Sequence, residues 1–184
     1  MWPWYALQVH SRKEAQSASY LAGKGYEAFL PQLKSTRQWS DRKKVVDLPL
    51  FPGYLFCRFD VLKKLPILQA PGVIQVVGNH RQPVPVDETE INAIRQLVAS
   101  GIPNEPWPYL EAGDRVRIWT GPLQGLEGLL VAIKGSHRLV LAVTLLQRAV
   151  AVEVDRASVQ LLESAVSDQE RTARKALRLL CVTN

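Results

Sequence analysis

The chain has 184 residues, a mass of 20.6 kDa and a formal net charge of +6, with 47% hydrophobic and 22% charged residues. A chain of this length buries a core without staples, and its two isolated cysteines, Cys57 and Cys181, provide neither a disulfide framework nor a zinc site. No apolar run is long enough to span a membrane and residues 1–9 lack a signal-peptide pattern, so we expect a cytoplasmic protein without membrane contact.

The positive charge is concentrated in the first half of the chain. Residues 1–101 carry 13 basic and 8 acidic side chains, residues 102–162 carry 6 of each, and residues 163–184 carry 4 basic and 3 acidic ones. This excess favours a polyanionic partner for the N-terminal part, and a solubilising surface charge explains it equally well.

Residues 1–101 have the pattern of alternating strands and helices. Apolar and aromatic runs predict strands over residues 3–9, 26–30, 48–59 and 73–77. Helical spacing predicts helices from about 12 to 22, over 61–69 and from 87 to about 99. Capping boxes mark the start of the first and the last helix, namely Ser11 with Glu14 and Asp87 with Glu90. One antiparallel sheet covered by helices, an α+β fold of ferredoxin-like type, accommodates this order.

Two further segments have distinct compositions. Residues 34–44 are polar and basic, which predicts a loop or an exposed hairpin arm. Residues 102–110 hold three prolines in nine positions, and we interpret this extended stretch as a domain linker.

The C-terminal part follows a different pattern. Short β-type segments without an intervening helix predict a small β-barrel, with strands over 115–119, 129–133, 138–146 and 149–154. Ser167 and Glu170 form a third capping box, and residues 168–182 alternate alanines and leucines at helical spacing with four basic residues. Residues 163–184 are therefore expected to form an appended basic, amphipathic helix.

The sequence lacks the patterns of a catalytic or metal centre. The histidines lie in different predicted elements: His10, His80 and His137. No cysteine, histidine or carboxylate cluster has metal-ligand spacing, and no nucleophile motif occurs. Gly121, Gly125 and Gly128 match neither a dinucleotide loop nor a Walker loop and suit a tight turn between strands. We therefore expect that the protein is not an enzyme, has no catalytic residues and binds no metal or cofactor.

An aromatic stretch over residues 49–56 stands out from the rest of the chain. Pro49 and Pro52 fix the backbone, and Gly53 permits a sharp change of direction before the strand resumes. Alternate strand side chains face opposite ways, so the aromatic residues here cannot all share one core. Either one face presents an aromatic pocket to a partner, or the stretch is ordinary core packing.

Motifs in both halves resemble those of one family. Residues 113–118 follow the pattern G-D-x-V-x-I and residues 121–128 the pattern G-P-x-x-G-x-x-G, which together are similar to a KOW motif. The N-terminal half has Trp-Tyr-x-Leu-x-Val at residues 4–9, Leu-Phe-Pro-Gly-Tyr-Leu-Phe at 50–56 and Pro-Gly-Val at 71–73. Together with Glu14, these resemble the N-terminal domain of the NusG family of transcription elongation factors. The resemblance covers residues 2–162, and the tail beyond it suggests a specialised paralogue of the RfaH type.

The resemblance implies a domain organisation and a principal partner. It implies a NusG-type N-terminal domain over 1–101, a linker over 102–110, a KOW barrel of Src-homology-3 type over 111–162 and a helical tail over 163–184. In this family the N-terminal domain binds the clamp coiled coil of bacterial RNA polymerase. The residues carried over to this contact are Phe51, Pro52 and Tyr54, with Tyr5 and Phe56 as supports.

The resemblance also implies contact with the non-template DNA strand. The matching residues follow the first strand and continue into the first helix: His10, Ser11, Arg12, Lys13, Gln16 and Tyr20. Arg12 and Lys13 suit phosphates, whereas His10 and Tyr20 suit stacking on an unpaired base. The alternative is that Arg12 and Lys13 only occupy a solvated helix start. RfaH-like proteins also use a threonine-rich stretch on polymerase, and the matching residues 65–68 have no hydroxyl group.

The KOW barrel of the family recruits the termination factor Rho or a ribosomal protein. The recruiting positions correspond here to Leu146, in place of a phenylalanine, and Arg148. Many β-branched valines in residues 140–154 favour strands over a helical alternative form. A plain KOW-type RNA-binding or ribosome-associated protein is the alternative function, but the zero net charge of residues 102–162 speaks against backbone binding.

Overall fold

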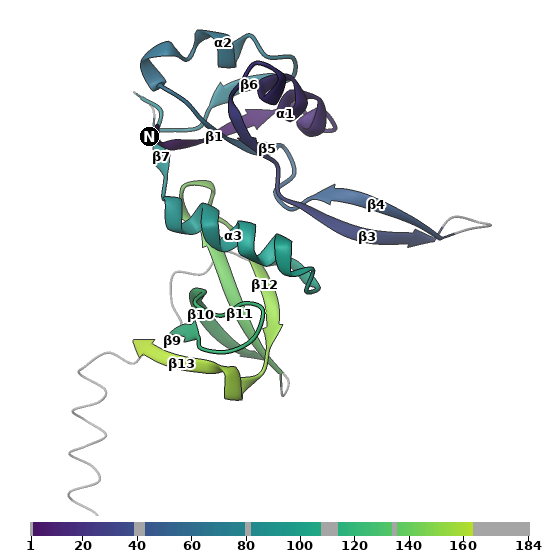
Figure 1. Ribbon diagram of the computed structural model, residues 1–184, viewed down its shortest axis with the longest axis vertical. Helices are drawn as coiled ribbons and strands as arrows, with labels where there is room; N and C mark the ends of the chain where they lie inside the picture. The colour runs from purple at the N-terminus through teal and green to yellow at the C-terminus, as the bar shows by residue number, and fades with distance from the viewer. Residues whose placement is uncertain (1, 39–42, 80–81, 108–113, 134–135, 164–184) are drawn as a thin grey trace, which may run out of the picture.

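The computed structural model describes residues 2–38, 43–79, 82–107, 114–133 and 136–163 and shows a mixed α+β architecture (Figure 1). The N-terminal sheet has the order β2-β5-β1-β6, with β7 also paired to β1, and every pairing is antiparallel. Its strands are β1 (Trp4–Val9), β2 (Glu27–Phe29), β5 (Tyr54–Arg58), β6 (Val73–Val76) and β7 (Pro85–Val86).

Helices cover both faces of this sheet (Figure 1). On β1, Tyr5, Leu7 and Val9 pack with α1 (Glu14–Gly23), α2 (Leu65–Leu68) and the neighbouring short turn η1 (Val61–Lys63). Trp4 and Ala6 point to the opposite face, as the period of two requires, and pack with α3 (Glu88–Ser100). The α3 stripe of Ile91, Ile94 and Leu97 is fully buried there.

A separate two-stranded hairpin projects from the N-terminal sheet (Figure 1). It consists of β3 (Gln32–Gln38) and β4 (Lys43–Pro49) in antiparallel register. Residues 34–44 were predicted as a loop or hairpin arm, and the described part of this segment is the arm.

The C-terminal part forms one antiparallel sheet with the order β13-β9-β10-β11-β12-β8. Its strands are β8 (Asn104–Trp107), β9 (Asp114–Ile118), β10 (Glu127–Ile133), β11 (Ser136–Val143), β12 (Arg148–Val154) and β13 (Val159–Glu163). Two short turns, η2 (Thr144–Leu146) and η3 (Arg156–Ser158), complete it.

The stretch over residues 102–110, expected to be a linker, contributes a strand to the C-terminal sheet. Residues 104–107 are extended, as its prolines predict, but they form β8 and pair with β12. Pro106 cannot donate to a ladder, and it is tolerated because β8 is the end strand of the sheet order. The expected tail helix over 163–184 lies, beyond residue 163, outside the described residues.

The first capping box is wrong, because α1 begins at Glu14 and its N-cap Lys13 makes no side-chain capping bond. Arg12 has a φ of 68°, which redirects the chain after β1. At α3 the Asp87 cap is confirmed, since its carboxylate accepts from the Thr89 N–H at 2.8 Å. Glu90, however, does not complete that box: it accepts from the Thr144 hydroxyl at 2.6 Å.

Helix α3 lies between the two sheets (Figure 1). One continuous apolar cluster joins its buried isoleucines to Leu139 and Leu141 of β11. Polar bonds supplement this packing: the Gln96 amide donates to the Gln124 carbonyl at 2.9 Å, in addition to the bond between Glu90 and Thr144. The C-terminal sheet is therefore docked on the N-terminal unit through α3.

Candidate functional site

The aromatic stretch divides between core and surface. Phe51 and Phe56 are buried, with ring centroids 6.1 Å apart and planes at 90°, and half-buried Tyr54 packs against the same cluster. Tyr5 is buried on the opposite face of the sheet, where its ring centroid lies 4.9 Å from that of Phe59. Pro52 is exposed. The structure thus brings Phe51, Tyr54 and Phe56 together and separates them from Tyr5.

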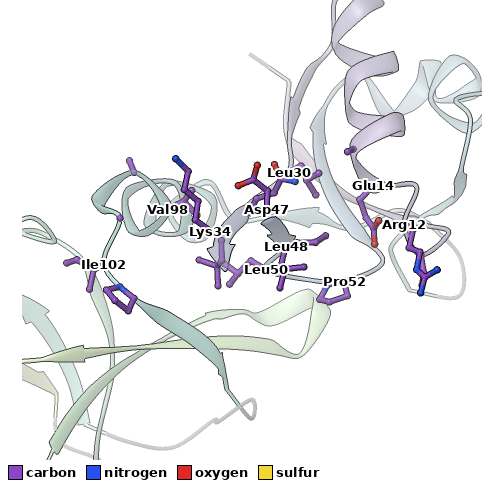
Figure 2. A pocket seen from close by; sticks show the side chains of 18 residues that line it. Arg12, Glu14, Leu30, Lys34, Asp47, Leu48, Leu50, Pro52, Val98 and Ile102 are labelled. Atoms are coloured by element: carbon purple, nitrogen blue, oxygen red, sulfur yellow. The ribbon is translucent and has the colours of Figure 1, made fainter. Parts of the chain in front are cut away.

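A groove with a volume of about 1320 Å³ runs beside this loop (Figure 2). It lies between the turn after β1, the base of the β3–β4 hairpin, the loop before β5 and the end of α3. Its apolar lining includes Leu30, Leu33, Leu48, Leu50, Pro52, Val98, Ile102 and Pro103. Arg12, Lys34 and Asp47 add charge along it. The groove is therefore apolar with a charged margin.

Most of these groove residues were missed by the sequence reasoning. Leu33 and Leu48 are cross-strand partners in the hairpin. The polar and basic residues between them led to the prediction of an exposed arm, so the two leucines were overlooked. Val98 and Ile102 stand at the end of α3, far from the hairpin in sequence. The predicted aromatic stretch does contribute Leu50 and Pro52 to the lining, and the apolar pair at the base of the polar arm is the signal that could have found Leu33 and Leu48.

The residues expected to contact DNA form an exposed turn at one end of the groove. His10, Arg12, Lys13 and Gln16 are exposed, and the Lys13 ammonium donates to the Gln16 side-chain oxygen at 3.0 Å. Arg12 also lines the groove. Tyr20 lies further along α1, where it is 38% exposed, and the Lys24 ammonium lies 5.7 Å from its ring centroid.

Glu14 links this turn to the aromatic loop. Its side chain is buried, and its Oε1 accepts a hydrogen bond from the Gly53 N–H at 3.0 Å. The Val9 N–H donates to the Gly53 carbonyl at 2.9 Å. Gly53 has a φ of 82°, the left-handed region that favours glycine. Sequence reasoning assigned Glu14 to a helix cap and missed this bond.

An ionic cluster fastens α3 to the sheet behind the site. Two guanidinium groups lie over the Trp4 ring, that of Arg58 at 4.8 Å and that of Arg95 at 4.7 Å from the ring centroid. Glu27 accepts hydrogen bonds from Arg95 at 2.8 Å and from Arg58 at 3.1 Å. The Arg95 hydrogen bond, supported by the charge of both arginines, holds the pKa of Glu27 below its ordinary value.

The two expected recruiting residues of the C-terminal sheet differ in exposure. Leu146 is half-buried against the apolar cluster that includes α3, whereas Arg148 at the start of β12 is exposed. Gln147 between them has a φ of 49°. The turn that carries Leu146 begins at Thr144, the residue bonded to Glu90 of α3.

Comparisons with known proteins identify the family. The family model described as "Transcription termination factor nusG" matches residues 3–95. The "Transcription termination/antitermination protein NusG" of Thermus thermophilus is 31% identical over 177 residues, covering 83% of this chain and 94% of the relative. The protein of that description from Borreliella burgdorferi is 27% identical, with the same two coverages. The chain belongs to the NusG family.

A solved NusG structure shares the fold. The structure described as "Domain interaction in Thermotoga maritima NusG" covers 89% of this chain and 98% of its own, with a TM-score of 0.53 and 21% identity. The NusG model match over residues 3–95 contains the aromatic loop, the turn after β1 and the hairpin.

The chemistry of the described residues gives no indication of catalysis. No group of three or more histidine, cysteine, aspartate or glutamate side chains there is placed to hold a metal ion. Burial raises the pKa of the Cys57 thiol to about 12, so this thiol stays protonated and unreactive at neutral pH. None of the helices in the described ranges is long and apolar enough to cross a membrane.

Proposed function

We propose that this NusG-family chain is a non-enzymatic transcription elongation factor that binds the clamp coiled coil of bacterial RNA polymerase and modulates pausing, termination or antitermination. The observation that carries this proposal is the apolar groove beside the aromatic loop. Its relatives in Thermus and Borreliella are named as termination/antitermination proteins.

The groove suits the tip of a helical coiled coil. Leucines of β3 and β4 and a valine of α3 are part of its lining. An amphipathic helix buries its apolar side on such a surface. The proposed contact residues are Pro52, which lines the groove, and Tyr54, which follows two positions later at the start of β5. Phe51 and Phe56 are buried, and Tyr5 lies beneath the sheet, so these three residues support the surface rather than touch the partner.

The exposed turn after β1 supports contact with the non-template DNA strand. It presents Arg12 and Lys13 to phosphates, with His10 and Gln16 beside them, at the margin of the groove. Tyr20 lies one to two turns further along α1 and extends this surface with a face for base stacking. Polymerase and DNA would thus meet adjacent surfaces.

The C-terminal sheet is proposed to be the KOW barrel of the family, following a ferredoxin-like N-terminal domain. The five antiparallel strands β9–β13 agree with such a module, and β8 adds to them from the segment expected to be the linker. Rho or a ribosomal protein would bind at the turn with Leu146 and Arg148. Because residues 163–184 lie beyond the family resemblance and position 146 lacks the phenylalanine of housekeeping members, we propose a specialised paralogue. Residues 65–68, which have no hydroxyl group, depart from the RfaH pattern.

The groove is tested by polar substitutions that leave the buried aromatic residues themselves unchanged. Leu33→Ser and Leu48→Ser replace half-buried groove residues, and each is expected to weaken binding to RNA polymerase by about tenfold, or about 1.4 kcal/mol. Leu62→Ser is the matched control, because Leu62 is 89% exposed on η1 and does not line the groove. Affinities are measured by titration of purified polymerase, with thermal melting to verify folding. Unchanged binding by both groove variants would contradict the proposal.

A further inference from the structure

Helix α1 carries the two buried polar residues that the described ranges contain, Glu14 and Ser17. Each reaches out of the helix to a different loop. The Glu14 carboxylate accepts from the Gly53 N–H at 3.0 Å, and the Ser17 hydroxyl lies 2.6 Å from the Pro71 carbonyl oxygen, to which it donates. A first-turn glutamate is ordinarily solvated, and burying one is costly unless it is paired. The position of Glu14 is therefore tied to the Gly53 loop.

We propose that Glu14 is a positioning residue that holds the Pro52–Gly53 turn against the turn formed by residues 10–16, so that the polymerase-binding and DNA-binding surfaces behave as one rigid unit. This inference rests on the proposed function of the two surfaces. Figure 2 shows Glu14 and Arg12 at the same end of the groove, beside the loop that carries Pro52.

The bonds to Gly53 explain how one carboxylate fixes the loop. Both backbone groups of Gly53 are held by the segment around the start of α1: its N–H by Glu14 and its carbonyl by the Val9 N–H at 2.9 Å. With its left-handed φ of 82°, Gly53 directs its N–H to Glu14 of α1 and its carbonyl to Val9 of β1. A bond from an amide to a carboxylate is stronger than one to a neutral acceptor. The helix N-terminus also favours the negative charge.

Removing the carboxylate has two consequences. The Gly53 N–H loses its acceptor at a part-buried position, and the loop is left with the Val9 bond and the turn bond from Tyr54 N to Phe51 O. The loop then samples conformations in which Pro52 and Tyr54 are displaced. Because apparent affinity falls in proportion to the binding-competent fraction, polymerase binding weakens although no contact residue has changed.

The first experiment measures the loop without any partner. In Glu14→Ala, amide exchange at Gly53, followed by NMR, is expected to be about tenfold faster than in the wild type. Glu14→Gln retains a side-chain oxygen of the same reach and is expected to stay within about threefold. Ser17→Ala is the matched control, because it removes a buried polar bond from the same helix but leaves Gly53 untouched. Equal exchange at Gly53 in Glu14→Ala and the wild type would overturn the proposal.

The second experiment measures polymerase binding and crosslinking to the non-template strand for the same three variants. Glu14→Ala is expected to weaken polymerase binding by about tenfold, while Glu14→Gln and Ser17→Ala remain within about twofold. If Ser17→Ala weakens binding as much as Glu14→Ala, general loss of stability explains both effects and the positioning role is wrong.

The outcomes distinguish this inference from the proposed function. If Leu33→Ser and Leu48→Ser weaken binding and Glu14→Ala does not, the groove is the polymerase surface and Glu14 has no positioning role. If the groove variants bind normally while Gly53 exchanges faster in Glu14→Ala, the tether exists but the function assigned to the loop is wrong.

Discussion

Glu27 is the residue on which the arginine cluster behind the site converges. It accepts from Arg95 and Arg58, and these guanidinium groups also lie over the Trp4 ring. Arg58 additionally pairs with Glu88 at the start of α3. One carboxylate thereby links β2, β5 and α3. Because the Glu27 side chain is 45% exposed, its value to stability is small, within the roughly 0–1 kcal/mol of surface ion pairs.

The lowered pKa of Glu27 predicts a pH-dependent contribution to stability. Since the pKa is lower in the folded than in the unfolded chain, the stabilisation is complete above the ordinary value of 4.5 and is lost as the pH falls through the folded pKa. Glu27→Gln is therefore expected to melt slightly below the wild type at neutral pH, with a difference that shrinks below pH 4.5. Thermal melts across this range measure it. A difference that grows on acidification would contradict the assignment.

At the scale of elements, periodicity predicted the parts of the fold whose side chains pack locally. The runs that predicted β1 and β6 and the Asp87 cap of α3 are confirmed. The start of α1 was wrong because the partner of Glu14 is Gly53, 39 positions away. Likewise, the pairing of β8 with β12 and the position of Leu33 opposite Leu48 depend on contacts that local pattern does not contain. The groove depends on the contact between β3 and β4, because Leu33 and Leu48 both line it.

The end of α3 offers a test of backbone geometry alone. Gly101 caps α3 with a φ of 66°, and a Cβ added there would meet nothing within 4 Å. Gly101→Ala is therefore expected to destabilise the protein by about 1–2 kcal/mol through left-handed strain only. Gly23→Ala is the matched control, since Gly23 also has open space but no positive φ, and it is expected to be neutral or slightly stabilising. Denaturant titrations compare the two; similar losses would contradict the strain argument.

For the molecule as a whole, α3 is the element that decides how the two sheets are joined. Its apolar stripe belongs to a cluster that continues into β11, and this cluster also contains Phe51 and Tyr54. Leu146 packs against it from the C-terminal side. Docking of the C-terminal sheet therefore shares an apolar core with the aromatic loop.

We expect the polar bonds between α3 and the C-terminal sheet to restrict the range of positions that this sheet adopts relative to the N-terminal unit. Glu90→Ala with Gln96→Ala removes the bonds to Thr144 and to the Gln124 carbonyl and keeps α3 helical, because alanine is a good helix former. Spin labels attached to cysteines introduced at exposed Leu62 and Gln160 report the distance between the two parts by electron paramagnetic resonance.

The native cysteines must not take up the label. Cys57 stays unlabelled because burial raises its pKa to about 12, and Cys181 is replaced by serine. We expect a narrow distance distribution in the wild type and in the same-helix control Asn92→Ala, whose side chain is exposed, and a broader one in the double variant. An unchanged width in the double variant would show that the apolar cluster alone holds the two parts together.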